Sequence, residues 1–210
     1  MVVEFGTAAE RLTCMATLAD YYRDLLVWEE IAFVSLIERW PAELVGEVEE
    51  DFRTAVASSK IKGASCPIRP RSTNQSIGNQ VEEFIVSRLA PRTTRFKILP
   101  CSGAGYPDKT LVQNSSGLKI AFEIKATSAW NPADSNRRVL TSSSEKIRRA
   151  FKPPVYHLLC TLLYTVQEGS ARIDAVRLDF IEPTTSVNVR LEASVNHKIL
   201  ASGSHKSIVI

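Results

Sequence analysis

Apolar residues at three- and four-residue spacing dominate the first quarter of the chain. This spacing places side chains on one face of an α-helix. It predicts a helix with the stripe Ala8, Leu12, Met15, Ala19, Tyr22 and Leu26, continued by Phe33, Leu36, Ile37 and Trp40. Pro41 ends or restarts the helix. A second helix is predicted from the stripe Leu44, Val48, Phe52 and Val56, with solvated acidic faces that carry Glu43, Glu47, Glu49, Glu50 and Asp51.

The periodic pattern stops at residues 58–75. This segment has two prolines and four basic residues, Lys60, Lys62, Arg69 and Arg71. We interpret it as a loop, or as a basic arm that follows nucleic-acid phosphates; the two interpretations are compatible. A helix is predicted at about 76–90, with one apolar face and Pro91 after it.

Strand-like apolar runs fill the rest of the chain. They predict strands at 95–100, 110–113, 118–126 and 171–181, with edge strands within 186–201. Residues 155–166 are continuously apolar, which favours a buried central strand over the alternative of a buried helix. The predicted fold class is α/β (α+β), with a central mixed β-sheet flanked by helices and an N-terminal helical segment.

Composition narrows the class of protein. The chain has 210 residues and 44% hydrophobic content, which suits one substantial domain with a small helical appendage. No run approaches the roughly 20 apolar residues that span a membrane, and the N-terminus does not resemble a signal peptide. The four scattered cysteines indicate reduced thiols in a cytoplasmic protein rather than disulfides or a zinc site.

Charge is unevenly divided along the chain. Residues 1–57 have 12 acidic and 4 basic residues, a net charge of −8, whereas residues 58–210 have 11 acidic and 22 basic residues, a net charge of +11. A basic body of this kind is typical of nucleic-acid-binding proteins. The alternative is that the two parts pair with each other. We expect residues 1–57 either to form a dimer or to pack on the core.

The candidate chemistry lies in two short motifs. Gly105-Tyr106-Pro107-Asp108 is a proline turn with an aspartate, and Glu123-Ile124-Lys125 lies in an apolar run fifteen residues later. In a strand, Glu123 and Lys125 project from the same face, and a hairpin turn at 114–117 would fold Asp108 against them. Two carboxylates and an amine suit a hard divalent ion and an attacking water. The alternative is a surface turn and a strand with two solvated charges.

Over about residues 72–164, these motifs resemble the PD-(D/E)XK nuclease superfamily, and more narrowly its type II restriction endonucleases. The resemblance implies a restriction-endonuclease-like core in residues 76–210. It implies one or two Mg²⁺ ions held by Asp108, Glu123 and the Ile124 carbonyl, with Lys125 orienting or helping to deprotonate the attacking water. It also implies DNA cleavage to 5′-phosphate and 3′-hydroxyl ends, and a homodimer.

A third acid is expected on the helix at 76–90. Helical geometry places Glu82 near the edge of the apolar face and Glu83 nearly opposite it. Similar enzymes carry a pattern like that of Gly78-Asn79-Gln80-Val81-Glu82 in this position. Both arguments favour Glu82, and an ordinary amphipathic helix is the alternative.

Residues 127–154 are the candidate DNA-binding segment. Ser142-Ser143-Ser144-Glu145 is a capping-box pattern that predicts a helix ending before Pro153. Inward-facing residues would be Ile147, Ala150 and Phe151. Phosphate contacts are expected from outward-facing basic residues and the serines, and base contacts from the preceding loop; the candidates are Trp130, Asn136, Arg137, Arg138, Ser142, Ser143, Ser144, Lys146, Arg148, Arg149 and Lys152. A solvated basic helix is the alternative.

Together these features predict a Mg²⁺-dependent, sequence-specific double-stranded DNA endonuclease of the type II restriction class. We expect no nucleotide cofactor, because no ATPase motif is visible and the lone Gly103-Ala104-Gly105, followed by a proline and no helix, is very weak evidence for a dinucleotide loop. The alternatives are a structure-specific repair or recombination nuclease of the same superfamily, or a catalytically silent DNA-binding module.

Overall fold

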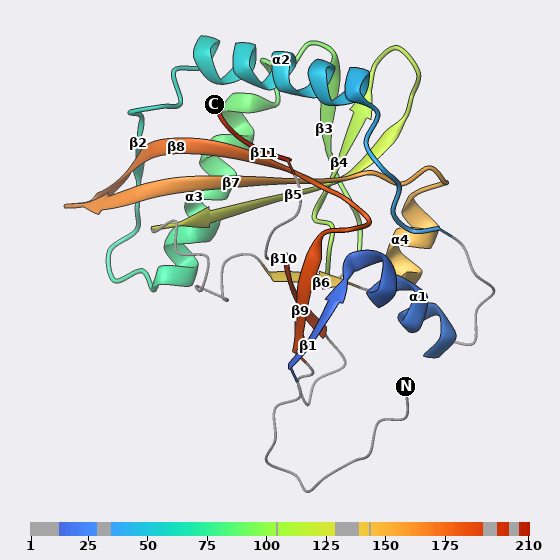
Figure 1. Ribbon diagram of the computed structural model, residues 1–210. Coiled ribbons are helices and arrows are strands. Elements are labelled where there is room, and N and C mark those ends of the chain that lie inside the picture. Colours follow the sequence, from blue (N-terminus) through green and yellow to red (C-terminus); the bar gives the residue numbers. More distant parts are fainter. Residues whose placement is uncertain are drawn as a thin grey trace, which may run out of the picture.

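A seven-stranded mixed sheet forms the centre of the molecule in the computed structural model, which describes residues 13–28, 35–103, 105–128, 139–142, 144–190, 197–201 and 206–210. The strand order is β11-β8-β7-β5-β4-β3, and β2 also pairs with β8 (Figure 1). Only the β5–β7 pair is parallel among these described strands. The bounds are β2 Ser65–Pro67, β3 Phe96–Pro100, β4 Lys109–Gln113, β5 Lys119–Thr127, β7 His157–Gln167, β8 Ser170–Ile181 and β11 Lys206–Val209.

The main strand predictions are confirmed. Residues 155–166 supply β7, which lies inside the sheet between β5 and β8, and its residues 157–162 are buried. A strand covered on both faces has no polar alternation, which explains its continuous apolar pattern. The chain is therefore a mixed α+β protein whose mixed sheet is flanked by helices.

The four helices in the described part of the chain cover the two faces of this sheet. Helices α2 (Ala42–Ser58) and α3 (Asn74–Leu89) share one apolar cluster with Ile120, Phe122 and Ile124 of β5. Helices α1 (Leu18–Trp28) and α4 (Ser144–Ala150) share a second cluster with Ala121 of β5 and Leu159 of β7. The sheet thus separates two layers of helices (Figure 1).

A second, four-stranded sheet has the order β1-β9-β10-β6, with bounds β1 Thr13–Thr17, β9 Ser186–Arg190, β10 His197–Ala201 and β6 Val139–Ser142. It corrects two predictions. Residues 13–17 are a strand rather than helix, because Thr17 and Asp20 form a reciprocal cap that starts the helix at Leu18. The strands within 186–201 belong to this separate sheet, not to the edges of the main one.

The predicted continuation of the first helix through Leu36, Ile37 and Trp40 is also wrong, since residues 35–40 have no regular structure. These apolar side chains are nevertheless buried, and Trp40 packs edge-on against Phe180 at 5.0 Å. The apolar character of these residues therefore correctly indicated that they are buried, but their spacing did not reflect a helix.

The second helix is confirmed as α2, and its apolar stripe lies in the core. One of its acidic residues is not solvated. Asp51 is 4% exposed, and its carboxylate accepts hydrogen bonds from the main-chain N–H groups of Thr94, Arg95 and Phe96. A buried carboxylate at the start of β3 satisfies donors that would otherwise lack partners. The acidic face of α2 therefore helps to fix the sheet.

Residues 58–75 are not only a loop. Cys66 and its neighbours form β2, and Ile68 N–H donates to the Gly169 carbonyl in the turn between β7 and β8. None of the helices in the described part of the chain is long and apolar enough to cross a membrane.

Candidate active site

The β4–β5 hairpin brings Asp108 to Glu123. The two strands are antiparallel, with Lys109 opposite Phe122, so the residue before Lys109 meets the residue after Phe122. The main-chain N–H of Asp108 donates to Glu123 Oε2 at 2.8 Å. The Asp108 side chain is exposed. The main chain of Asp108 therefore holds the turn in place and leaves its carboxylate available.

Glu123 and Lys125 form an ion pair on one face of β5, with 2.5 Å between Oε1 and Nζ. The Glu123 side chain is 3% exposed and that of Lys125 is 24% exposed. Burial raises the pKa of the Glu123 carboxyl, although Lys125 opposes the shift. Burial alone would lower the pKa of Lys125, but the negative charges of Glu123, Glu82 and Asp108 outweigh it and raise the pKa. Lys125 is thus held as an ammonium.

The sheet opens at this point. Pairing between β4 and β5 ends at Phe122, while β5 stays paired with β7 through Thr127. On the open edge, the N–H of Ala126 donates to Glu82 Oε1 at 3.1 Å. Peptide groups alternate between the two edges of a strand. The Ile124 carbonyl therefore shares the open edge with the Ala126 N–H.

Glu82 is the helical carboxylate that reaches the site. It lies in α3, and burial raises its pKa to about 7 despite the attraction of Lys125 and the bond from Ala126. Glu83 is exposed. Both acids line the same depression, and Glu82 is the one whose carboxylate is bonded to β5; its role as the third acid stays a prediction.

A depression of about 480 Å³ adjoins the open edge. Its lining includes Glu82, Asp108, Lys109 and Ile124. Glu123 and Lys125 are not among the described residues that line it. They lie on the other face of β5, so the predicted site residues meet at the edge of the sheet and approach it from both faces.

Tyr106 and His157 support the Asp108 turn, although neither was predicted as a site residue. Tyr106 Oη lies 2.8 Å from His157 Nδ1, and His157 Nε2 lies 2.7 Å from the Leu36 carbonyl oxygen. The carbonyl accepts only, so Nε2 carries the proton and Nδ1 accepts from the tyrosine hydroxyl. A polar residue opening the apolar run at 157 was the available signal for a buried hydrogen bond.

Helix α4 confirms the predicted start, and Ile147 and Phe151 pack inward. Lys146 contradicts the expectation of an outward basic side chain. It is 4% exposed, and its ammonium donates to the carbonyls of Gly103 (2.8 Å) and Gly105 (2.5 Å). These carbonyls precede the Asp108 turn and hold the lysine inward.

The other expected DNA contacts divide into two groups. Arg149 and Lys152 are exposed and Arg148 is half-buried. Trp130, Asn136, Arg137, Arg138 and Ser143 lie outside the described residues, as do the side chains of Ser142 and Ser144. Their roles stay predictions.

The candidate donor atoms are all oxygens, which is the type of ligand that Mg²⁺ prefers. No three His, Cys, Asp or Glu side chains gather at metal-binding spacing in the described residues. The candidate donors are two carboxylates, of Asp108 and Glu123, and the Ile124 carbonyl. Mg²⁺ commonly takes one or two protein carboxylates and completes its shell with water and substrate oxygens. A cation would also offset the unfavourable burial of the Glu123 carboxylate.

Comparison with known proteins adds no support for or against a function at this site. No protein-family model and no curated protein matches the chain. Among solved structures, restriction endonuclease MvaI in the absence of DNA aligns over 93% of this chain and 92% of that chain, with 10% identity and a TM-score of 0.13. A TM-score this low supports no conclusion about activity.

Proposed function

We propose that this protein is a Mg²⁺-dependent DNA endonuclease with a restriction-endonuclease-like core. The observation that carries the proposal is the contact of the Asp108 turn with the Glu123–Lys125 ion pair at the point where β5 loses its partner β4. An open sheet edge gives a phosphate room to approach, and a hairpin fixes the charged groups around it. Such groups are fixed before substrate arrives, which is the condition for electrostatic catalysis.

Each residue has a distinct role in the proposal. Asp108, Glu123 and the Ile124 carbonyl would hold Mg²⁺. Bound there, the ion would acidify a water and neutralise charge on the phosphoryl group. Lys125 keeps its proton, because the surrounding carboxylates raise its pKa. It therefore orients the attacking water and offsets phosphate charge, and we assign it no role as a base.

Glu82 also lies at the open edge. Its pKa of about 7 leaves it able to accept or release a proton near neutral pH. Its bond to Ala126 fixes the carboxylate beside the Ile124 peptide. We propose that Glu82 positions a water or extends the metal site.

The finer proposal is a type II restriction enzyme. It would cut a short sequence in double-stranded DNA to 5′-phosphate and 3′-hydroxyl ends. A homodimer would cut both strands of a palindromic site. The apolar stripe of α2 is buried in the core of its own chain, so the dimer would use another surface. Sedimentation velocity of the protein alone and with DNA tests this part.

The deciding experiment is incubation of purified protein with long duplex DNA, with Mg²⁺ or with EDTA. Asp108→Asn is the most informative variant, because the bond from Asp108 to Glu123 is made by the main chain and survives. Lys125→Ala tests the ammonium. Lys97→Ala, an exposed lysine of β3, is the matched control.

We expect discrete Mg²⁺-dependent fragments from the wild-type protein and from Lys97→Ala. Asp108→Asn and Lys125→Ala should cleave at least about 100-fold more slowly, the usual loss when one transition-state contact is removed. A smear would indicate low sequence specificity and direct attention to branched or mismatched substrates. Binding without cleavage by the wild-type protein would indicate a silent DNA-binding module.

A further inference from the structure

A basic groove lies between the β4–β5 turn and the end of α4. It has a volume of about 820 Å³. One wall is the turn that joins β4 to β5, and the other is the last turn of α4 with the two prolines after it. Four basic residues and no acidic residue belong to its described lining; the basic ones are Lys119, Arg148, Arg149 and Lys152.

Three of these cations, Lys119, Arg149 and Lys152, are exposed. None of the three forms an ion pair with another described residue. Arg149 lies in the last turn of α4, where a positive charge also favours the helix dipole. Lys119 is the first residue of strand β5, so a helix dipole does not stabilise its charge.

The turn that carries Lys119 is internally braced. Ser116 Oγ donates to Gln113 Oε1 at 2.5 Å and accepts from the Leu118 N–H at 3.1 Å. The Gln113 amide donates to Glu47 of α2 at 2.6 Å. These bonds connect the turn to the core. The groove wall is therefore fixed before a ligand binds, which lowers the entropic cost of binding.

The groove lies on the same face of β5 as the ion pair. Lys119, Ala121, Glu123 and Lys125 stand two residues apart in β5 and so project from one face. Helix α4 packs on this face, since Ile147 shares a cluster with Ala121. Glu123 lies four positions after Lys119 in β5, a span of ~13 Å along the strand. A DNA duplex covers this span in about four base pairs, at 3.4 Å each.

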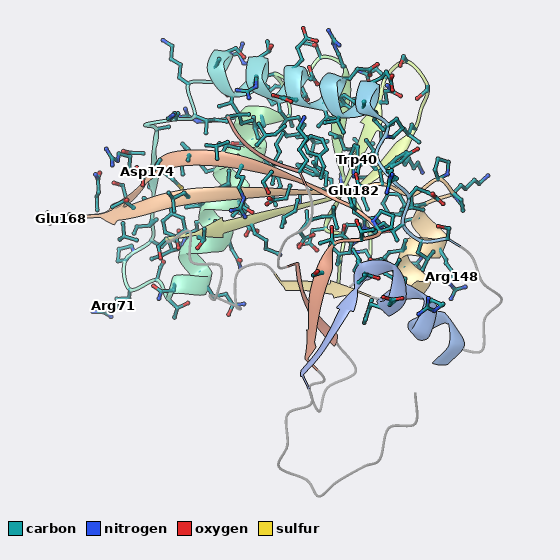
Figure 2. All side chains as sticks on the ribbon, in the orientation of Figure 1. Trp40, Arg71, Arg148, Glu168, Asp174 and Glu182 are labelled. Atoms are coloured by element: carbon teal, nitrogen blue, oxygen red, sulfur yellow. The ribbon has the colours of Figure 1, made fainter. Side chains whose placement is uncertain are left out.

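We propose that this groove binds the DNA phosphate backbone about four base pairs from the phosphate that is cleaved. The inference rests on the proposed function and adds to it the track of the DNA across the protein. It assigns phosphate contacts to Lys119, Arg149 and Lys152. Lys119 belongs to the β4–β5 hairpin, which also presents Asp108. Arg71, in the other basic segment, lies at the opposite end of the molecule from Arg148 (Figure 2).

The test is DNA binding in EDTA as a function of salt, with a duplex of random sequence. Each phosphate contact contributes about 0.9 to the slope of log affinity against log salt concentration. The triple variant Lys119→Gln, Arg149→Gln, Lys152→Gln should lower that slope by about 2 to 3. It should also weaken binding at least about 10-fold at low salt. All three side chains are exposed, so the thermal unfolding temperature should change little.

Arg172→Gln is the matched control, because it removes one charge that Asp174 already pairs at 2.9 Å. Asp174 and Arg148 lie at opposite ends of the molecule (Figure 2). The control should keep the wild-type slope.

Binding in EDTA is separate from cleavage, so the two proposals fail separately. A reduced slope in the triple variant supports the groove even if the wild-type protein cuts nothing. Cleavage by the wild-type protein with an unchanged slope in the triple variant overturns the groove and leaves the nuclease. No salt-dependent DNA binding by the wild-type protein in EDTA overturns the groove, whereas the nuclease is overturned only by the absence of Mg²⁺-dependent cleavage.

Discussion

The hydroxyl of Tyr106 donates a hydrogen bond to Nδ1 of His157 across 2.8 Å, with both side chains almost completely buried. The rings are also stacked, with centroids 5.7 Å apart. Tyr106 lies two residues before Asp108, and His157 begins β7. This bond therefore connects the turn that presents the candidate metal-binding carboxylate to the centre of the sheet.

Tyr106→Phe should lower the free energy of unfolding by about 1–3 kcal/mol, because the buried His157 Nδ1 loses its donor. It should also lower cleavage by loosening the Asp108 turn. Urea unfolding measures the first effect, and initial cleavage rates measure the second. Tyr156→Phe is the control, since that hydroxyl has no hydrogen-bond partner among the described residues. Equal stability losses in the two variants would contradict the assigned role of the Tyr106–His157 bond.

His157 should make stability depend on pH in acid. Burial lowers its pKa to about 4 in the folded protein, against 6.5 when unfolded. Between these values the unfolded state binds more protons, so stability falls as pH falls from 6.5 to 4, by about 3 kcal/mol in total. His157→Gln removes this contribution. The difference in unfolding free energy between wild type and variant should therefore change across this window, and a constant difference would contradict the assignment.

Lys125→Ala should lower the free energy of unfolding by about 3 kcal/mol at pH 8, because it leaves Glu123 charged and buried without its partner. The loss of the cation raises the pKa of Glu123 further. The destabilisation is therefore present above that pKa and disappears as pH falls through it. Adding Glu123→Gln should restore much of the stability at pH 8. A double variant no more stable than Lys125→Ala would show that the pair is not coupled.

Two neighbouring acids of α2 should differ sharply in their effect. Asp51→Ala removes four hydrogen bonds to Thr94, Arg95 and Phe96, and should cost about 2–4 kcal/mol. Glu50→Ala removes only an exposed ion pair with Arg95, at 2.7 Å, and should cost less than about 1 kcal/mol. Chemical unfolding of the two variants provides the comparison, and similar losses would contradict the role given to Asp51.

Local patterns predicted the main sheet well. The hairpin that joins Asp108 to Glu123 follows from a short turn between two apolar runs, and the buried strand β7 follows from an unbroken one. Both signals depend on neighbours in sequence, so a single sequence contains them. Asp108, Glu123 and Lys125 were predicted to lie together for the same reason, and the hairpin and the ion pair bring them into contact.

The wrong predictions concern residues whose structure depends on contacts with residues far away in the sequence. Residues 13–17 form a strand because they pair with 186–190, a contact that no local pattern specifies. Lys146 turns inward because carbonyls 41 and 43 residues earlier accept its ammonium. Asp51 is buried because β3 presents three N–H groups to it. Helical periodicity describes which face a side chain occupies, but not what another segment brings to that face.

The small sheet joins nearly opposite ends of the chain, since β1 at 13–17 must wait for β9 at 186–190. The strands that present Asp108, Glu123 and Lys125 and their neighbour β7 are complete by residue 167. On the ribosome, we therefore expect the candidate active site to assemble before its amino-terminal strand has a partner. During synthesis, the strands of the candidate active site would therefore form before the small sheet that contains β1 and β9.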